Sequence, residues 1–489
     1  AETSGNAANI AYLKKSTPTF VDDLRSAAEA DWSNPSTAVD ILPTVRRNLF
    51  NSAREFEPTP YDTFTSEVAT PHQRWAKPLD GGPVRILVIA PTWSQRETVE
   101  LSQRLDVKAT TFSVSRRDVL FDKRWLMLYD SYRLYGYKPR NVVSVLGDLA
   151  NKLQEEYDCI VIGDVKRDIL PDYFVDAIAE KVRAGTGLVA TGMGRTVAAD
   201  ILGKNSQPLP FRALLPIEAL PGLRDFGWQE PKEKGLLTRA ATVGSGRILQ
   251  MNHAVASNLN LSLTPHVSHE YDYVPADYEY SQALIAKAVL WAAQRQPAAE
   301  ITDLTMDSVR VALREPVPAA GLDISVHDRD GRVEFEQKTK VNLKGGDCDV
   351  PLDLVLRRAG KHFLDVTLRR PNGDVIDWAS IAFDTTAPAA IGGIQLETTV
   401  LVPGAPLTGK VSLHNTPPQS RLLLAVTDAY ERVLATQVAE LAPGASAHPF
   451  SVSLAEPLCA MHRIDATLVD AKGDLDWAQA EFTIPNREL

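Results

Sequence analysis

Residues 188–195, LVATGMGR, run from a predicted strand into a Gly-Met-Gly turn. Many α/β enzymes present a nucleophile in such a turn, at the carboxyl end of a parallel strand. Met193 stands at this position, and its thioether can neither attack a carbonyl carbon nor release a proton. Two residues with acid–base chemistry, Asp164 and His253, follow other predicted strands. If their side chains meet in space, they could act as an acid–base pair.

Further residues at the predicted strand ends could bind a ligand, because open α/β sheets bind ligands at this edge. They are Thr92, Trp93, Thr191, Met193 and Asn252. Structural roles stay open beside the functional ones: Asp164 as a helix cap or loop anchor, and His253 as a hydrogen-bonded core residue. Ser94 is a nucleophile only in principle, since its segment predicts a helix N-terminus with Glu97 completing a capping box.

A second group of polar residues lies in TPHVSHEYDYVPADYEY, residues 264–280. His266 and His269, with acidic neighbours, are ligand types that a metal ion could use. The prolines of this segment predict a loop, however, where spacing guarantees no geometry, so we predict neither a metal site nor a cofactor. Tyr271 and Tyr273, interleaved with acidic residues, suit contact with a carbohydrate or a protein, and we expect this loop to be a contact surface.

Strands and helices must alternate over residues 84–297 to position these side chains. VRILVIAP and YDCIVIGDV are continuous apolar runs, typical of strands buried on both faces of a parallel sheet. Helical stretches of ten or more residues separate them from each other and from GTGLVATG. This alternation implies right-handed crossovers and a doubly wound, flavodoxin-like sheet.

The pattern changes after about residue 300, where short alternating runs are separated by turn signals such as PNGD and AKGD. Residues 361–383 align with residues 461–482, which brings Trp378 opposite Trp477. A period of about 100 residues is the size of one immunoglobulin-like sandwich, so we predict two tandem copies. The two tryptophans could stack on sugars, but their repetition at one fold position favours a core role in both copies.

The order of apolar strands and helices, with LPFRALLPIEALPGL and GSGRILQMNH later in the chain, resembles the class I glutamine amidotransferase-like fold. It resembles more closely the degenerate version of that fold, the trimerisation domain of bacterial β-galactosidases. The resemblance covers roughly residues 84–297. It implies an amidotransferase-like sheet, and contacts between subunits as the role of the domain.

The sequence departs from active members of that family at both catalytic positions. The family's turn carries a cysteine that forms a thioester, where this chain has Met193. The family's histidine is followed two residues on by a glutamate, which His253 lacks. An amidotransferase activity is therefore not expected.

Composition restricts the partners. The chain has 489 residues and a formal charge of −10, without a cluster of Lys and Arg, so nucleic acid is not expected. No apolar run reaches the ~18 residues of a membrane span. Three cysteines make no disulfide framework; Cys159 is predicted in the core, and Cys348 and Cys459 could pair. The absence of an initial methionine, together with the domain types, favours export to the periplasm, cell surface or medium.

These observations predict a helical segment with a proline-rich arm over 1–80, the α/β domain over 81–298, and two sandwiches over 299–388 and 389–489. Our leading hypothesis is a non-catalytic scaffold of an exported bacterial protein, associated with a carbohydrate-active enzyme. Its expected partners are its own copies in a homo-oligomer or other domains of a larger protein, with carbohydrate as a candidate ligand. The alternatives are a hydrolase using Asp164 and His253, and a purely structural surface or assembly protein.

Overall fold

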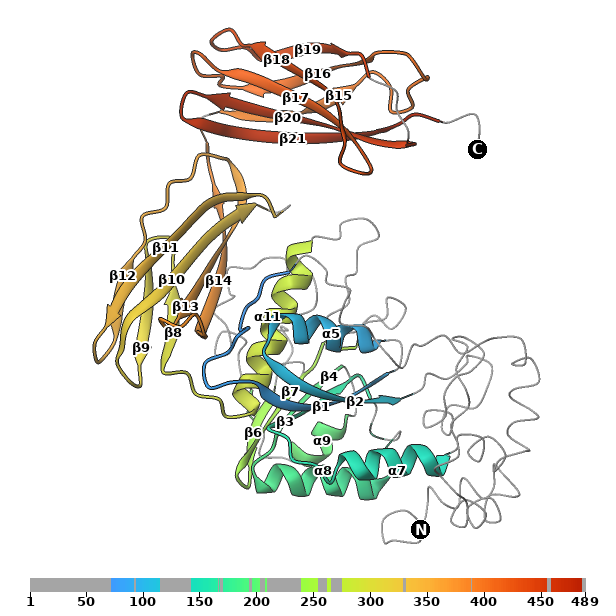
Figure 1. The fold of residues 1–489 in the computed structure, drawn as a ribbon, viewed down its shortest axis with the longest axis vertical. Coiled ribbons are helices and arrows are strands. Elements are labelled where there is room, and N and C mark those ends of the chain that lie inside the picture. Colours follow the sequence, from blue (N-terminus) through green and yellow to red (C-terminus); the bar gives the residue numbers. More distant parts are fainter. Residues whose placement is uncertain are drawn as a thin grey trace, which may run out of the picture. The chain divides into compact units, whose positions relative to one another are not determined.

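The computed structural model describes thirteen stretches of the chain (Figure 1). They are residues 72–91, 94–114, 142–165, 167, 170–192, 196–202, 207–208, 239–253, 262–264, 275–328, 331–387, 389–454 and 459–485. The helices predicted within residues 1–71 lie outside this set. The chain forms two compact units: the first comprises residues up to Ile324 with Gln337–Leu352 and Asp365–Ile381, and the second comprises the remainder.

Within the described residues of the first unit, a seven-stranded sheet has the order β2-β1-β3-β4-β7-β6-β5. Five neighbouring strands, β2 to β7 in that order, run parallel, and β6 and β5 add an antiparallel edge. The strands are β1 (Val84–Pro91), β2 (Val107–Val114), β3 (Cys159–Gly163), β4 (Gly187–Thr191), β5 (Gln207–Pro208), β6 (Arg239–Val243) and β7 (Gly246–Met251).

Helices cover both faces of this sheet, so the doubly wound fold is confirmed (Figure 1). The helices α7, α8 and α9 lie on one face, and α5 and α11 lie on the other. Their bounds are α5 (Gln95–Arg104), α7 (Val142–Lys152), α8 (Asp172–Ala184), α9 (Val197–Leu202) and α11 (Pro275–Ala292). The last of these ends before Pro297, because Gln294 adopts a left-handed φ of 57° that cannot continue a helix.

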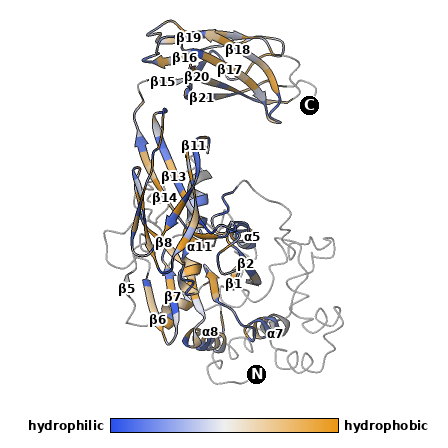
Figure 2. Ribbon diagram, turned by 60° about the vertical axis from the view of Figure 1, so that its left-hand side comes forward, coloured by the Kyte–Doolittle hydropathy of each residue, from blue (hydrophilic) through white to orange (hydrophobic). Residues whose placement is uncertain are grey.

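The central strands are apolar because both of their faces are covered. Cys159–Gly163 and Gly187–Thr191 are buried at every position, and Cys159 is fully buried, as predicted. Figure 2 shows the hydrophobic colouring of β1 beside the mixed colouring of α8. On one face, Phe174 and Ile178 of α8 pack with strand residues such as Ile160.

Two β-sandwiches follow, as the alternating pattern predicts. The strands of the first are β8 (Ala299–Leu304), β9 (Ser308–Leu313), β10 (Val317–Asp328), β11 (Val333–Leu343), β12 (Cys348–Pro351), β13 (Gly360–Arg369) and β14 (Val375–Thr385). Those of the second are β15 (Ala390–Leu396), β16 (Leu407–His414), β17 (Arg421–Asp428), β18 (Val433–Glu440), β19 (Ala447–Val452), β20 (Met461–Asp470) and β21 (Gly473–Thr483).

The two sandwiches have one topology. The first has sheets β11-β10-β13-β14 and β12-β9-β8, and the second has β18-β17-β20-β21 and β19-β16-β15. Equivalent side chains also repeat: the His362 ring stacks on Phe383 with centroids 5.7 Å apart, and His462 stacks on Phe482 at 5.2 Å. The sequence repeat is therefore a structural repeat, strand by strand.

Candidate functional site

The carboxyl ends of four adjacent parallel strands form one edge of the α/β sheet, which we call the rim. Pro91, Gly163, Thr191 and Met251 end β1, β3, β4 and β7 respectively. This edge is where an α/β sheet of this kind presents ligand-binding groups.

A segment of the chain itself, residues 262–264, is seated on the rim. All three residues are buried. The Glu97 carboxylate accepts hydrogen bonds from the three consecutive backbone amides of Ser262, Leu263 and Thr264, at 2.5, 2.8 and 3.0 Å. The Thr264 hydroxyl donates a fourth at 2.8 Å. Burial raises the pKa of Glu97, and these hydrogen bonds oppose that rise.

This contact corrects the predicted capping box. Ser94 precedes helix α5 but makes no side-chain capping hydrogen bond. Its hydroxyl instead donates to the Pro91 carbonyl at 2.9 Å. Glu97 does not return to the helix terminus, because its carboxylate is used by the segment 262–264. The local motif predicts the start of the helix, but Ser262, 165 positions away, binds the carboxylate of Glu97.

Thr191 and Gly163 hold the same segment from the strand side. The Thr191 hydroxyl, which is fully buried, donates to the Ser262 carbonyl at 2.5 Å. A Cβ atom at Gly163 would lie 2.6 Å from Ser262 Oγ, which is closer than side chains can pack. Thr191 was predicted as a ligand-binding residue, and in this structure it binds the chain's own backbone.

His253 lies beneath this segment, with 2% of its surface exposed. Its Nε2 lies 3.0 Å from the Leu263 carbonyl oxygen, so Nε2 carries the proton and donates. Burial lowers the pKa of His253 to about 3. The ring is therefore neutral at physiological pH, and a base with so low a pKa is poorly matched to proton abstraction near pH 7.

Asp164 follows β3 in a left-handed backbone conformation, with φ of 46°. Its amide donates to the Thr191 carbonyl at 3.3 Å. Gly192 approaches it so closely that a Cβ atom there would lie 2.4 Å from Asp164 Oδ1. Asp164 and His253 follow β3 and β7, which flank β4 in the sheet. Asp164 and His253 thus follow strand ends, as predicted, and Asn252 lies between His253 and Met251, the last residue of β7.

The other predicted site residues lie outside the described part of the chain. They are Thr92, Trp93, Met193, His266, His269, Tyr271 and Tyr273. Their proposed binding roles stay predictions. Among the residues that the structure does describe, no three His, Cys, Asp or Glu side chains are grouped as metal ligands, and no helix is long and apolar enough to cross a membrane. Cys159, Cys348 and Cys459 are free thiols.

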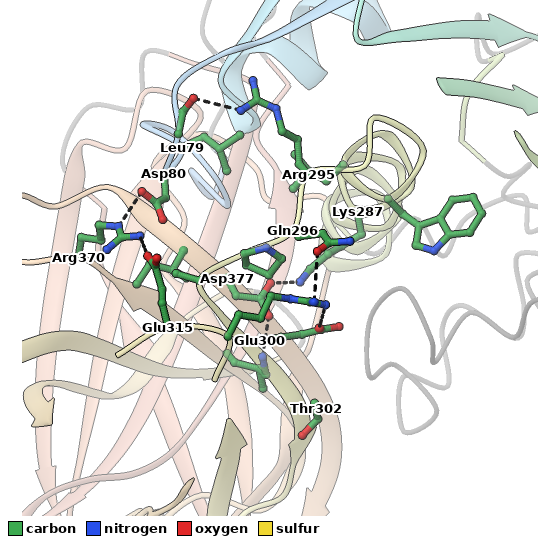
Figure 3. Close-up of a pocket in the computed structure, with 18 residues that line it drawn as sticks. Leu79, Asp80, Lys287, Arg295, Gln296, Glu300, Thr302, Glu315, Arg370 and Asp377 are labelled. Atoms are coloured by element: carbon green, nitrogen blue, oxygen red, sulfur yellow. Dashed lines mark hydrogen bonds and ion pairs between the residues drawn. The ribbon is translucent and has the colours of Figure 1, made fainter. Parts of the chain in front are cut away.

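A pocket of about 660 Å³ lies elsewhere in the first unit, between the end of α11, residues 79–81 and the first sandwich (Figure 3). Arg370 bridges two carboxylates there, with Asp80 at 2.7 Å and Glu315 at 2.6 Å, and these bonds raise its pKa. Arg295 donates to the carbonyl of Gly81 at 3.1 Å. The charged side chains that line this pocket bind one another, an arrangement suited to holding segments together.

Asp377, the aspartate of the repeated Asp-Trp dipeptide, forms part of this pocket's wall. Asp377 accepts a hydrogen bond from the backbone amide of Ile301 in β8 at 2.7 Å and forms an ion pair with Lys287 of α11. The Lys287 ammonium also lies 4.2 Å from the centre of the Trp378 ring, a cation–π contact. Trp378 is fully buried, as the core interpretation predicts. We call Asp377, Trp378 and Lys287 the first Asp-Trp joint.

The second unit contains the equivalent arrangement. Asp476 accepts the backbone amide of Ile391 in β15 at 2.7 Å, and its other oxygen lies 3.7 Å from Arg358 of the first sandwich. The Arg358 guanidinium lies 5.3 Å from the Trp477 ring centre. We call Asp476, Trp477 and Arg358 the second Asp-Trp joint. In both joints the Asp binds the first strand of its own sandwich and a cation that precedes the sandwich in sequence.

Trp477 differs from the predicted core role. It is only half-buried, and its indole Nε1 donates to Asp328 Oδ2 at 2.7 Å. Arg332 lies 5.3 Å from the same ring and pairs with Asp474 at 2.7 Å. The sequence alone predicts for these tryptophans either a core position or a platform for sugars. The signal that was available is the acidic residue before each Trp together with the arginines near the end of the first sandwich.

No family model matches the chain, and no curated protein matches it. Solved structures with distant similarity include a tetra-tandem repeat in the extending region of a large adhesion protein, at 16% identity, TM-score 0.17, over 38% of this chain and 49% of that one. Red sea bream transglutaminase matches at 13% identity, TM-score 0.20, over 52% of this chain and 40% of its own. An FMN-binding β-glucuronidase from Facaelibacterium prausnitzii L2-6 matches at 12%, TM-score 0.17, over 39% and 35%. The chain thus spans half or less of each matched structure.

The fold defines the class: this is a multidomain protein with an α/β domain and β-sandwich domains.

Proposed function

We propose that this chain is a non-catalytic scaffold and interaction region of an exported bacterial multidomain protein, associated with a carbohydrate-active enzyme. One observation carries the non-catalytic part: the segment 262–264 occupies the rim where the α/β domain would otherwise expose reactive groups. Glu97, Thr191 and His253 all bind this segment. Side chains so engaged are committed to the chain's own backbone.

The resemblance to the degenerate amidotransferase-like domain supports the same proposal. In that resemblance the turn of the missing nucleophile holds Met193, and the domain's role is contact between subunits. The two Asp-Trp joints add a structural argument, because each links a sandwich to the element that precedes it. A chain built from such links positions other domains or subunits. Export fits this proposal, since sandwiches of this kind are frequent in cell-surface proteins.

The catalytic alternative is tested by assaying the full chain on chromogenic glycosides, chromogenic acyl esters and glutamine. We expect no turnover above that of the heat-denatured chain. The variants His253→Gln and Asp164→Asn are assayed in parallel, because they remove the two candidate acid–base groups. Turnover by the native chain that both substitutions abolish would replace the scaffold proposal with a hydrolase.

The scaffold part is tested by light scattering over a range of protein concentrations. We expect a single species with a mass that is a small multiple of 53.6 kDa and independent of concentration. Mass that grows without limit as concentration rises would instead support an assembly protein. A monomer at every concentration would remove self-association from the proposal.

A further inference from the structure

Asp428 and Arg432, between β17 and β18 of the second sandwich, make the same backbone contacts as Asp328 and Arg332, between β10 and β11 of the first. In the first sandwich the Asp328 amide donates to the Arg332 carbonyl at 3.0 Å, and the Arg332 amide donates to Asp328 Oδ1 at 2.8 Å. In the second, the Asp428 amide donates to the Arg432 carbonyl at 3.2 Å, and the Arg432 amide donates to Asp428 Oδ1 at 3.1 Å. The described residues Asp328 and Arg332 are therefore equivalent to Asp428 and Arg432 in these hydrogen bonds.

The equivalent arginines have different partners. Arg332 donates to Asp474 of the following sandwich, and Asp328 Oδ2 accepts hydrogen bonds from the indole N–H of Trp477 and from Arg358. Arg432 instead turns back, and its Nε donates to Asp428 Oδ2 at 2.7 Å. The oxygen that binds an indole in the first sandwich is therefore covered, in the second, by the arginine of its own loop.

Exposed apolar side chains surround this second loop. Tyr430 is 76% exposed and Met461 is 48% exposed. The Ala429 amide donates to the Met461 carbonyl, and Met461 pairs with Thr483, which bridges to Val400, itself 55% exposed. The residue equivalent to Met461 in the first sandwich is the cationic Lys361. This end of the second sandwich thus combines a charged receptor loop with an apolar margin, a composition typical of interaction surfaces.

We propose that Asp428, Arg432, Tyr430 and Met461 bind a further β-sandwich through an acidic hairpin that carries an Asp-Trp dipeptide. The second sandwich itself has such a hairpin, with Asp470, Asp474 and Trp477, and it docks on Arg357, Arg332 and Asp328. On binding, Arg432 moves from Asp428 to a carboxylate of the incoming hairpin, and Asp428 Oδ2 accepts the incoming indole N–H. This proposal rests on the equivalence of the Asp328–Arg332 and Asp428–Arg432 pairs; Pro457 and Leu458 stand where the first sandwich has Arg357 and Arg358. It is independent of whether the α/β domain is catalytic.

The test extends the full chain by one repeat, with a second copy of residues 386–485 appended after Pro485. Spin labels at 436 in the native sandwich and at 436 in the added copy report the distance distribution between the two sandwiches. Labels at Glu336 and Thr436 of the unextended chain, both exposed and both in the second compact unit, give the benchmark for a docked pair. Cys348→Ser and Cys459→Ser remove the accessible thiols, and circular dichroism checks the fold of each protein.

We expect the new pair to give a distribution as narrow as the benchmark. Arg432→Glu in the native sandwich should broaden this distance distribution at least twofold. Combining it with Asp474→Arg in the added copy should narrow the distribution again, because the ion pair is restored with reversed charges. Lys410→Glu, the same charge change at an exposed position on β16, leaves the width unchanged. A broad distribution in the extended chain beside a narrow benchmark would overturn the proposal, as would a width insensitive to Arg432→Glu.

Discussion

The two Asp-Trp joints use one sequence motif in two environments. In the first joint Trp378 is fully buried under Lys287, and its Nε1 has no hydrogen-bond partner in the described residues. In the second, Trp477 is half-buried between two arginines and donates to Asp328. In both joints the aspartate accepts a hydrogen bond from a backbone amide in the first strand of its sandwich, whereas the two tryptophans have different environments. A repeated motif therefore fixes the position of a side chain in its own sandwich, and the neighbouring element decides how that side chain is used.

The largest expected loss of stability comes from replacing Trp378, and it should exceed the loss from replacing Trp477. Trp378→Ala removes a fully buried indole and should lower the free energy of unfolding of the first unit by about 3–5 kcal/mol. Trp477→Ala removes a half-buried ring and should cost about 1–3 kcal/mol. Calorimetry of the two variants measures both. Equal losses would show that the two joints are energetically alike in spite of their different burial.

Replacing the aspartate of each joint should also destabilise the two joints by different amounts. Asp377→Ala leaves the Lys287 ammonium and the Ile301 amide without their acceptor in a buried site, a loss of about 3 kcal/mol. Asp476→Ala also frees a backbone amide, but Arg358 keeps its 2.8 Å bond to Asp328, so about 1–2 kcal/mol is expected. Denaturant titration of the two variants checks the order. The double variant Asp377→Ala/Lys287→Met should recover part of the first loss, because it removes the unpaired charge.

The stability of the α/β domain should depend on pH through His253 at the rim. His253 has an ordinary pKa of 6.5 when unfolded and about 3 when folded, so the unfolded chain binds one more proton between these values. Stability contributed by neutral His253 is complete above pH 6.5 and is lost as pH falls below it, at about 1.4 kcal/mol per pH unit. Between pH 6.5 and 5 the loss should be about 2 kcal/mol for the α/β domain.

His253→Gln is the matched control for that titration, since an amide can donate to the Leu263 carbonyl without titrating. The difference in slope between the native chain and this variant isolates the histidine from Glu97, whose pKa is shifted in the opposite direction. Identical slopes would mean that His253 stays accessible to protons in the folded chain.

The smallest effect tests the hydrogen bond of the second joint alone. Trp477→Phe keeps an aromatic ring between Arg332 and Arg358 but deletes the donor to Asp328, and should cost about 1–1.5 kcal/mol. Trp378→Phe deletes no hydrogen bond and should lose stability only through the cavity it leaves. Adding Asp328→Asn to each variant separates the two cases. In the Trp378→Phe variant it should lower the stability further by its full effect, whereas in the Trp477→Phe variant it should lower the stability less, because the hydrogen bond is already lost.

Sequence patterns predicted the parts of the fold that depend on local regularity. The continuous apolar runs around Ile86 and Ile160 gave the buried parallel strands, and the alternation within the repeats gave both sandwiches. The strand ends that carry Asp164, Thr191 and His253 were located for the same reason. What these residues contact was not predictable, because Glu97 and Ser262 meet only through the tertiary fold, across 165 residues. The pairing of Trp477 with Asp328 is likewise a contact between two repeats, which periodicity within one repeat cannot reveal.

The way Glu97 holds residues 262–264 has a consequence for how this segment tolerates change. A carboxylate that accepts three successive main-chain amides recognises backbone, which every amino acid except proline supplies. Proline at any of these three positions removes an amide that Glu97 binds, whereas any other residue keeps that amide and must still fit a buried site. The place of this segment in the fold therefore depends on a glutamate that lies 165 residues earlier in the chain.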